Sequence, residues 1–153
     1  ELKLIIDGGP TQKGIESTVI DVRNESLIIL RPGPITSEMI ENIAKVKPKI
    51  EYFSSSPESP GMLKKHYSPG IPVLLNQKGA DKNCALITFG KKYKNKTNCF
   101  NLSKKSDLKE AASNLYKTFR KIKKQGFKKI YVVKIPNIGA GIAINDRLKR
   151  ASN

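Results

Sequence analysis

The apolar residues of the first part of this chain fall into short runs separated by turn-forming residues. Runs at residues 2–6, 17–22 and 27–30 predict strands, and the short polar turn between the last two predicts a hairpin. Thr36 or Ser37 can cap a helix over residues 36–45, in which Met39, Ile40 and Ile43 share one face. This part is therefore predicted to contain a few strands and one short helix.

From residue 71 onwards, apolar runs alternate with helical repeats. Continuously apolar runs are typical of strands buried on both faces of a parallel sheet, and they occur at residues 73–75, 85–89, 99–102 and 129–135. Residues 106–124 predict the clearest helix, because their apolar residues recur at helical spacing, and residues 142–151 predict a closing helix. This order predicts a small doubly wound α/β domain.

Two proline-rich stretches separate these regions. Residues 54–60 read SSSPESP, a composition typical of a linker. Residues 59–69 read SPGMLKKHYSP, which is too interrupted for a helix or strand, and they carry His66 and Tyr67. Two interpretations of this loop stay open: a structured spacer, or a loop that contacts a ligand.

The chain is strongly basic, with 29 Lys and Arg residues against 13 Asp and Glu and a net charge of +16. Such a charge indicates a polyanionic partner such as tRNA or another RNA. The alternative is compositional drift, because nearly all of the excess is Lys, whereas specific phosphate and base recognition favours Arg.

Other composition features narrow the class of protein. No apolar run approaches the length of a membrane span, so no membrane association is expected. Cys84 and Cys99 have neither zinc-ligand nor redox-pair spacing, and we expect free thiols in a reducing cytoplasm. With one His in the chain, a metal site made of protein ligands alone is not expected.

Two neighbouring segments contain candidate anion-binding groups. In KGIESTV, residues 13–19, Gly14 permits a close backbone approach, and Ser17 and Thr18 place hydroxyls at the start of a strand. Arg31 stands at a strand end before the rigid turn RPGP, where its guanidinium can bind an anion through two hydrogen bonds. Solvent-facing hydroxyls and a surface salt bridge are the alternatives.

The last segment of interest is GAGIAINDRLKR, residues 139–150. A glycine-rich turn into a helix can bind an anion, and a tight packing turn is the alternative. Asp146 and Arg147 are sequence neighbours that are not expected to face each other, so at least one should reach another element. No catalytic triad or carboxylate pair can be assembled, which favours chemistry based on positioning and charge stabilisation.

Four segments in this order resemble the C-terminal half of one family, the threonylcarbamoyl-AMP synthases of the longer type. They are DGGPTQKGIESTVIDV, ILRPGPIT, SPGMLKKHYSP and GIAINDRLKRAS. In this type a YrdC-like domain precedes a linker and a second α/β domain. The resemblance implies that residues 1–53 end a YrdC-like catalytic domain, residues 54–70 are an interdomain linker or lid, and residues 71–153 are a Rossmann-like α/β domain.

The resemblance also implies an activity. Such enzymes are nucleotidyltransferases that make L-threonylcarbamoyladenylate and diphosphate from L-threonine, bicarbonate and ATP, for tRNA modification in the cytoplasm. Ser17 resembles the hydroxyl that holds threonine, Arg31 the arginine that contacts ATP, and Tyr67 the linker tyrosine over the nucleotide, with His66 beside it as lid support. Mg²⁺ is expected to come with ATP, and no covalent catalytic residue is expected.

The family's basic Lys/Arg motif and Ser-Ala-Asn segment, which build most of the pocket, would lie before Glu1. We therefore expect a C-terminal fragment that is inactive without the missing half, its expected partner if that half is encoded separately. The alternatives are a non-catalytic nucleotide- or RNA-binding module and a non-functional remnant of a split gene.

Overall fold

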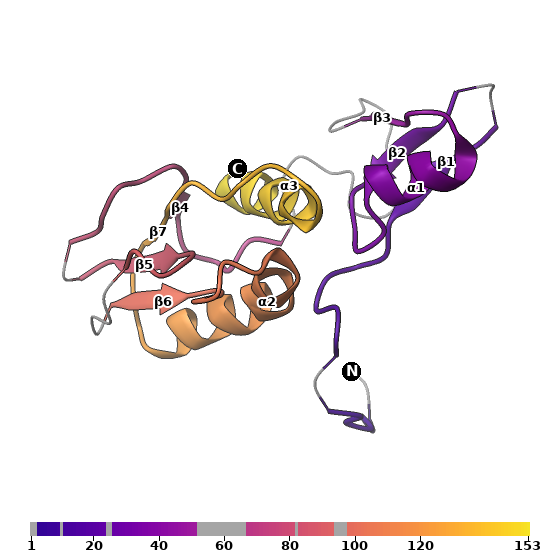
Figure 1. Ribbon diagram of the computed structural model, residues 1–153. Coiled ribbons are helices and arrows are strands. Elements are labelled where there is room, and N and C mark those ends of the chain that lie inside the picture. Colours follow the sequence, from indigo (N-terminus) through magenta and orange to yellow (C-terminus); the bar gives the residue numbers. More distant parts are fainter. Residues whose placement is uncertain (1–2, 10, 24–25, 52–66, 82, 94–97) are drawn as a thin grey trace.

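The computed structural model describes residues 3–9, 11–23, 26–51, 67–81, 83–93 and 98–153, which form two separate sheets (Figure 1). We refer to residues 3–51 as the N-terminal region and to residues 67–153 as the C-terminal region. The N-terminal region contains β1 (Val19–Asp21), β2 (Ile28–Arg31), α1 (Ser37–Ala44) and β3 (Lys49–Ile50). The C-terminal region contains β4 (Val73–Leu74), β5 (Ala85–Thr88), β6 (Cys99–Asn101), α2 (Leu108–Lys124), β7 (Ile130–Val132) and α3 (Ala140–Ser152).

The first sheet combines a hairpin with a crossover. Strands β1 and β2 form the antiparallel hairpin that the sequence predicted, and an irregularity between Val19 and Ile20 sets Val19 opposite Arg31 and Ile20 opposite Ile29. Strand β3 pairs in parallel with β2, and α1 makes the crossover that a parallel neighbour requires. Arg31, the last residue of β2, therefore lies opposite Val19, the first residue of β1.

One prediction for the N-terminal region is wrong, and the helix that was predicted there buries only part of its apolar face. Residues 3–6, part of the run predicted as a strand, form no strand, and Leu4, Ile5 and Ile6 are exposed. In α1, Ile40 is buried, whereas Met39 and Ile43 of the same predicted face are exposed. Helical spacing of apolar residues creates an apolar face, but that face is buried only where a second element packs on it. None of the described residues covers Met39 and Ile43 of α1.

The second sheet is wholly parallel, in the order β4-β7-β5-β6. Strand β5 is central, with Leu86 in register with Cys99 on one side and Tyr131 on the other. All four residues of β5 are buried, which confirms the prediction of a strand buried on both faces. This sheet with its helices confirms the α/β fold class.

Helix α2 follows the predicted amphipathic pattern. The Oδ1 atom of Asp107 accepts hydrogen bonds from the backbone N–H groups of Lys109 (2.7 Å) and Glu110 (3.2 Å), so Asp107 is the cap where the sequence suggested Ser106. Apolar residues at helical spacing form its buried face: Ala111, Ala112, Leu115, Phe119 and Ile122. None of the described helices has the length and apolar character that a membrane span needs.

Helices α2 and α3 lie between the second sheet and the N-terminal region (Figure 1). In α3, the buried residues include Ile144 and Leu148, as expected for a core helix, but also the charged residues Asp146, Arg147 and Arg150. Buried charges need partners. One of these partners comes from the N-terminal region, and it leads to the candidate site.

Candidate functional site

Ser17 and Arg31, two separately predicted candidates, are in direct contact. Arg31 Nη2 donates a hydrogen bond to Ser17 Oγ over 3.1 Å, and Arg31 Nε donates to the Ser17 carbonyl oxygen over 3.0 Å. The β1–β2 register explains the contact, because Val19 lies opposite Arg31 and Ser17 comes just before it. Ser17 is exposed. A hydroxyl beside a guanidinium offers hydrogen-bond donors and positive charge, the combination that a carboxylate or phosphate requires.

The backbone on both sides of this serine is tightly packed. A Cβ atom on Gly33 would collide with the backbone nitrogen of Thr18, so the RPGP turn has room only for glycine. Gly14 has a φ of +67°, and a Cβ atom there would collide with the backbone of Ser113 in α2. Thr18 Oγ1 donates to the Ile35 carbonyl oxygen over 2.6 Å and accepts from the Ile35 N–H over 3.1 Å. The segment is therefore held between the turn after β2 and helix α2.

Glu16 connects this segment to α3. Its Oε2 accepts a hydrogen bond from Arg147 Nε over 3.1 Å. Arg147 Nη1 bonds Asp146 over 2.7 Å, and Asp146 also pairs with Arg150 Nε over 3.0 Å. Both arginine side chains are fully buried, whereas the Glu16 side chain is 34% exposed. Two carboxylates thus face two guanidiniums, and the buried charges are balanced.

Tyr67 packs against the same arginine. The Cζ atom of Arg147 lies 5.2 Å from the centroid of the Tyr67 ring, and this ring stacks on Tyr116 with centroids 5.8 Å apart. The Tyr116 hydroxyl donates to the Glu16 carboxylate over 3.2 Å. Tyr67 has a φ of 62°, a left-handed conformation that is strained for a bulky residue. Its contacts with Tyr116 and Arg147 hold it there.

The environment of this cluster fixes its protonation states. Burial, together with the Glu16 charge, raises the pKa of Tyr116, so its hydroxyl is a neutral donor near pH 7. Burial also raises the pKa of Tyr67, while the charges of Arg147 and Arg31 oppose that shift. Burial lowers the pKa of Arg147, but its neighbours, Tyr67 first among them, outweigh burial and raise it. The cluster therefore holds a charged Arg147 guanidinium against the neutral Tyr67 ring, which stacks on the neutral Tyr116.

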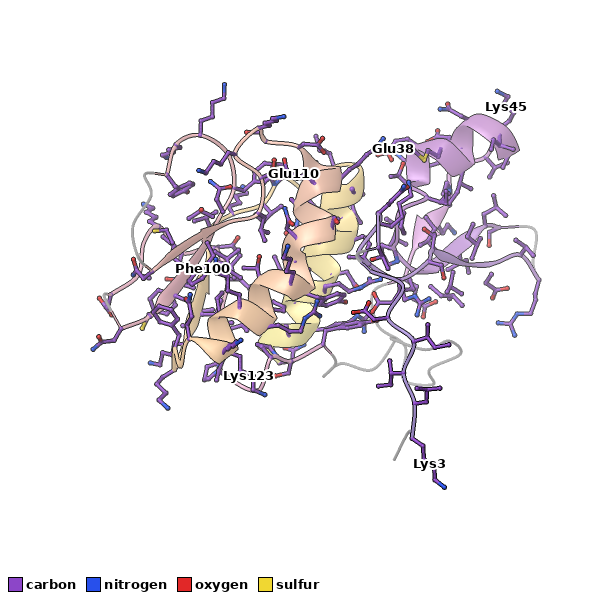
Figure 2. All side chains as sticks on the ribbon, turned by 90° about the horizontal axis from the view of Figure 1, so that it is seen from below. Lys3, Glu38, Lys45, Phe100, Glu110 and Lys123 are labelled. Carbon is purple, nitrogen blue, oxygen red and sulfur yellow. The ribbon has the colours of Figure 1, made fainter. Side chains whose placement is uncertain are left out.

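The glycine-rich turn before α3 is a packing turn, the alternative that the sequence left open. A Cβ atom on Gly141 would collide with the Pro136 carbonyl oxygen. The start of α3 also faces a carboxylate of the chain itself, Glu38. The Thr36 side chain, the backbone N–H of Glu38 and the backbone N–H of Gly139 lower the pKa of Glu38. Figure 2 shows Glu38 between α1 and the C-terminal region.

The prediction for the neighbouring residues Asp146 and Arg147 is half right. Their side chains are bonded to each other, which the sequence interpretation excluded, because the long guanidinium folds back along the helix. Arg147 does reach another element, as predicted, and that element is the segment containing Glu16.

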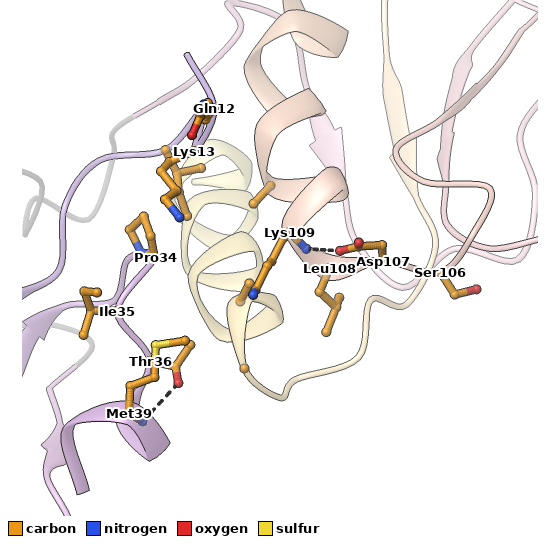
Figure 3. Close-up of a pocket in the computed structure, with 14 residues that line it drawn as sticks. Gln12, Lys13, Pro34, Ile35, Thr36, Met39, Ser106, Asp107, Leu108 and Lys109 are labelled. Atoms are coloured by element: carbon orange, nitrogen blue, oxygen red, sulfur yellow. Dashed lines mark hydrogen bonds between the residues drawn. The ribbon is translucent and has the colours of Figure 1, made fainter. Parts of the chain in front are cut away.

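A separate cavity of about 710 Å³ lies between residues 12–15 and 34–39 on one side and the starts of α2 and α3 on the other (Figure 3). Its lining mixes two lysines, Lys13 and Lys109, with apolar residues such as Met39 and Leu108. Ser17, Arg31 and Tyr67 do not line it. The predicted site residues therefore form a cluster of their own outside this cavity.

Of the four predicted site residues, Ser17 and Arg31 are in contact, and Tyr67 is linked to their segment through Arg147 and Glu16. The fourth, His66, lies outside the described residues. Sequence reasoning missed Glu16 and Tyr116, although Glu16 sits inside the KGIESTV segment that it singled out. Glu16 could have been recognised from the sequence as a charged residue between Ile15 and the candidate Ser17. The helical pattern of α2 contained nothing that marked Tyr116 as a site residue.

Known proteins of one family match most of the chain. The profile described as threonylcarbamoyl-AMP synthase, C-terminal domain (Sua5_C), matches residues 35–153. Threonylcarbamoyl-AMP synthase of Bacillus subtilis is 28% identical over 166 residues, which cover 97% of this chain and 48% of that protein. Its counterpart from Pyrococcus abyssi is 30% identical over 171 residues, 99% of this chain and 50% of that protein.

Two solved structures have the same fold. Pyrococcus abyssi Sua5 complexed with L-threonine matches with a TM-score of 0.80 and 28% identity, over 95% of this chain and 48% of that chain. A variant of this Sua5, in which an adjacent His and Tyr are both replaced by Ala, matches with a TM-score of 0.73 and 26% identity, over 95% and 47% of the two chains. The chain thus spans about half the length of the curated relatives it matches.

Proposed function

Since this chain belongs to the threonylcarbamoyl-AMP synthase family, whose C-terminal domain its residues 35–153 match, we propose that it is the C-terminal half of an L-threonylcarbamoyladenylate synthase. In this reaction the amine of L-threonine and bicarbonate form a carbamate and water. A carbamate oxygen then attacks the α-phosphorus of ATP, and diphosphate leaves. The product supplies the threonylcarbamoyl group for tRNA modification. The division into residues 1–53, 54–70 and 71–153 is part of this proposal.

One observation carries the proposal: the contact between Ser17 and Arg31. An exposed hydroxyl held by a guanidinium suits a substrate with a carboxylate, and a solved relative is complexed with L-threonine. We assign Ser17 to L-threonine and Arg31 to ATP, because the planar fork of a guanidinium binds phosphate oxygens in pairs. Chemistry of this kind needs positioning and charge stabilisation and no covalent residue.

Tyr67 is assigned to the nucleotide. Its ring packs on Arg147, which also bonds Glu16 beside Ser17, and an aromatic ring can stack on a base or hydrogen-bond through its hydroxyl. A structure exists of a relative lacking an adjacent His–Tyr pair, and in this chain the single His directly precedes Tyr67. His66 is proposed to support Tyr67. No group of three or more metal-ligating side chains occurs among the described residues, so Mg²⁺ is proposed to enter bound to ATP.

The test joins the first half of the Bacillus subtilis relative to this chain and measures diphosphate release with L-threonine, bicarbonate and ATP. Turnover that requires all three substrates is expected, and none from this chain alone. Ser17→Ala should raise KM for L-threonine, and Arg31→Lys should raise KM for ATP, each roughly 10-fold to 100-fold. Ser152→Ala and Arg23→Lys, both on exposed positions, are the matched controls. A folded hybrid without turnover contradicts the proposal.

A non-catalytic nucleotide- or RNA-binding module is the competing function. Three cations on α2, Lys117, Arg120 and Lys123, line two small cavities of about 270 and 260 Å³ on either side of Tyr116. This function predicts an inactive hybrid and RNA binding by this chain that weakens about 20-fold to 40-fold between 50 and 200 mM salt, as three phosphate contacts require. An active hybrid with weak RNA binding favours the synthase.

A further inference from the structure

We infer that Arg147 and Tyr116 are positioning residues, which fix the segment carrying Ser17 and the ring of Tyr67 relative to each other. The C-terminal region would then act in the reaction by holding Ser17, which lies outside it, and Tyr67, at its own start, in place. The inference rests on the proposed function, because it concerns catalysis only if Ser17 and Tyr67 bind substrates.

The first step is the link from α3 to Ser17. Glu16 directly precedes Ser17, and its carboxylate is held by two donors of the C-terminal region, Arg147 Nε at 3.1 Å and the Tyr116 hydroxyl at 3.2 Å. On its other side Ser17 is held by Arg31 at the end of β2. Arg31, in the same sheet, therefore holds Ser17 directly, and Arg147 in α3 holds it indirectly through Glu16.

The second step is that the same two residues hold Tyr67. Its ring lies between the Arg147 guanidinium, at 5.2 Å, and the Tyr116 ring, at 5.8 Å. Its positive φ is a strained conformation for a bulky residue, and such strain persists only where surrounding contacts impose it. Strain held at a residue next to a substrate group is typical of a functional constraint, since a relaxed loop would serve a spacer equally well.

The third step is that Arg147 is a poor choice for stability alone. Its side chain is fully buried, and its Nη2 atom has no hydrogen-bond partner among the described residues. Replacing a buried ion pair with apolar residues of similar volume is often neutral or stabilising. An unpaired guanidinium nitrogen is therefore a cost of folding, and simultaneous contact with Glu16 and Tyr67 explains why an arginine stands here.

The first experiment uses this chain alone and does not depend on activity. Tyr116→Phe removes one oxygen, and Tyr131→Phe, on a half-buried tyrosine of β7, is its matched control. In ¹⁵N-labelled protein, Tyr116→Phe should shift the amide signal of Ser17 and the ring signals of Tyr67, and Tyr131→Phe should leave both in place. Unchanged Ser17 and Tyr67 signals in a folded Tyr116→Phe protein would overturn the inference.

The second experiment uses the hybrid with the first half of the Bacillus subtilis relative. Tyr116→Phe and Glu16→Gln should each lower kcat/KM for L-threonine about 10-fold, while Tyr131→Phe changes it by about twofold or less. Because Tyr116 is proposed to act through Glu16, the double variant should be no worse than Glu16→Gln. The positioning role would be overturned if the losses in kcat/KM from Tyr116→Phe and Glu16→Gln were additive in the double variant. It would also be overturned if Tyr131→Phe lowered kcat/KM as much as Tyr116→Phe does.

Arg147→Met tests the arginine itself, and Tyr116→Phe keeps the inference falsifiable if that variant does not fold. The two experiments also separate the two proposals. A hybrid without turnover refutes the synthase, whereas the signals of Ser17 and Tyr67 still decide whether the C-terminal region holds them. An active hybrid that tolerates Tyr116→Phe refutes positioning and leaves the synthase standing.

Discussion

At the scale of single residues, the absence of a Cβ atom at Gly14 allows the segment with Ser17 to pack against α2. Gly14 combines a φ of +67° with a position where a Cβ atom would collide with Ser113. Both features exclude other residues, because an L residue would be strained and its Cβ atom would meet rigid backbone. The segment can approach α2 only through this glycine.

We therefore predict that Gly14→Ala lowers the free energy of unfolding by about 1–3 kcal/mol. Gly8→Ala is the matched control, because nothing lies within 4 Å of a Cβ atom placed there. Urea unfolding followed by circular dichroism measures both. A Gly14→Ala protein as stable as Gly8→Ala would show that the segment is not fixed against α2.

The sequence predicted the chemistry of single residues better than their partners. Ser17 and Arg31 were recognised as groups suited to an anion, and two apolar runs predicted the hairpin that joins them, but not the irregularity between Val19 and Ile20 that sets Val19 opposite Arg31. The bond from Arg147 to Glu16 joins residues 131 positions apart in different regions. No local pattern encodes such a distance, because it depends on how two separately formed regions dock.

At the scale of elements, the start of α1 and the start of α3 share the Glu38 carboxylate. The Thr36 side chain, then the N–H of Glu38, then the N–H of Gly139 lower its pKa from the ordinary value of 4.5. A carboxylate whose pKa is lowered by folding stabilises the protein above the pKa of the unfolded chain. This stabilisation is lost as the pH falls through the folded pKa.

Glu38→Gln should therefore lower the free energy of unfolding near pH 7 by about 0.5 kcal/mol or less, since the side chain is exposed and solvent screens it. The difference from the parent should shrink as the pH falls below 4.5 and vanish once the pH is below the folded pKa of Glu38. Urea unfolding at a series of pH values measures it. Glu41→Gln controls for the loss of one negative charge from α1, and a difference that grows toward low pH would contradict the assignment.

Helix α1 carries a second test, in its apolar residues. Ile40 is buried, whereas Ile43 is 86% exposed. Ile43→Lys should leave stability within about 0.5 kcal/mol and reduce self-association, while Ile40→Lys should cost about 3 kcal/mol or more, since it buries an unpaired charge. Thermal unfolding and light scattering measure the two effects. Equal losses from both would mean that Ile43 is covered in solution.

Elements were predictable where packing agrees with local preference. Helix α2 and strand β5 match their patterns, because their apolar residues face the core that the pattern implies. The run at residues 2–6 has the same local preference and is no strand at its described residues, since no neighbouring strand is there to pair with it. Propensity fixes what a segment can become, and its partners decide what it does become.

At the scale of the whole molecule, the two regions have unequal cores. One continuous cluster of buried apolar residues joins β4–β7, α2 and α3, whereas the N-terminal region buries Ile29, Leu30 and Ile40. Stability follows buried apolar area, so the C-terminal region should open last. The N-terminal region depends on its contacts with α2 and α3.

Limited proteolysis tests this order. We predict that residues 3–9, which are exposed and form no helix or strand, are cut first and that residues 67–153 survive longest. Mass spectrometry of the fragments over time identifies them. Glu16→Gln should speed cleavage of the N-terminal region and leave the C-terminal fragment as resistant as before. Equal resistance along the whole chain would show that the two regions unfold as one unit.

The bond between Glu16 and Arg147 also has a consequence for the history of the family. Arg147 is fully buried but Glu16 is 34% exposed, so losing one charge of this pair costs less than breaking a fully buried pair, about 1–3 kcal/mol, which is still a sizeable part of the 5–15 kcal/mol that holds an ordinary domain together. A lineage that loses either charge alone would be selected against. Across homologous genes, the codons aligned with these two positions should therefore change together or stay as they are. A sequence survey in which one of these two positions varied while the other was conserved would show that the pair is dispensable.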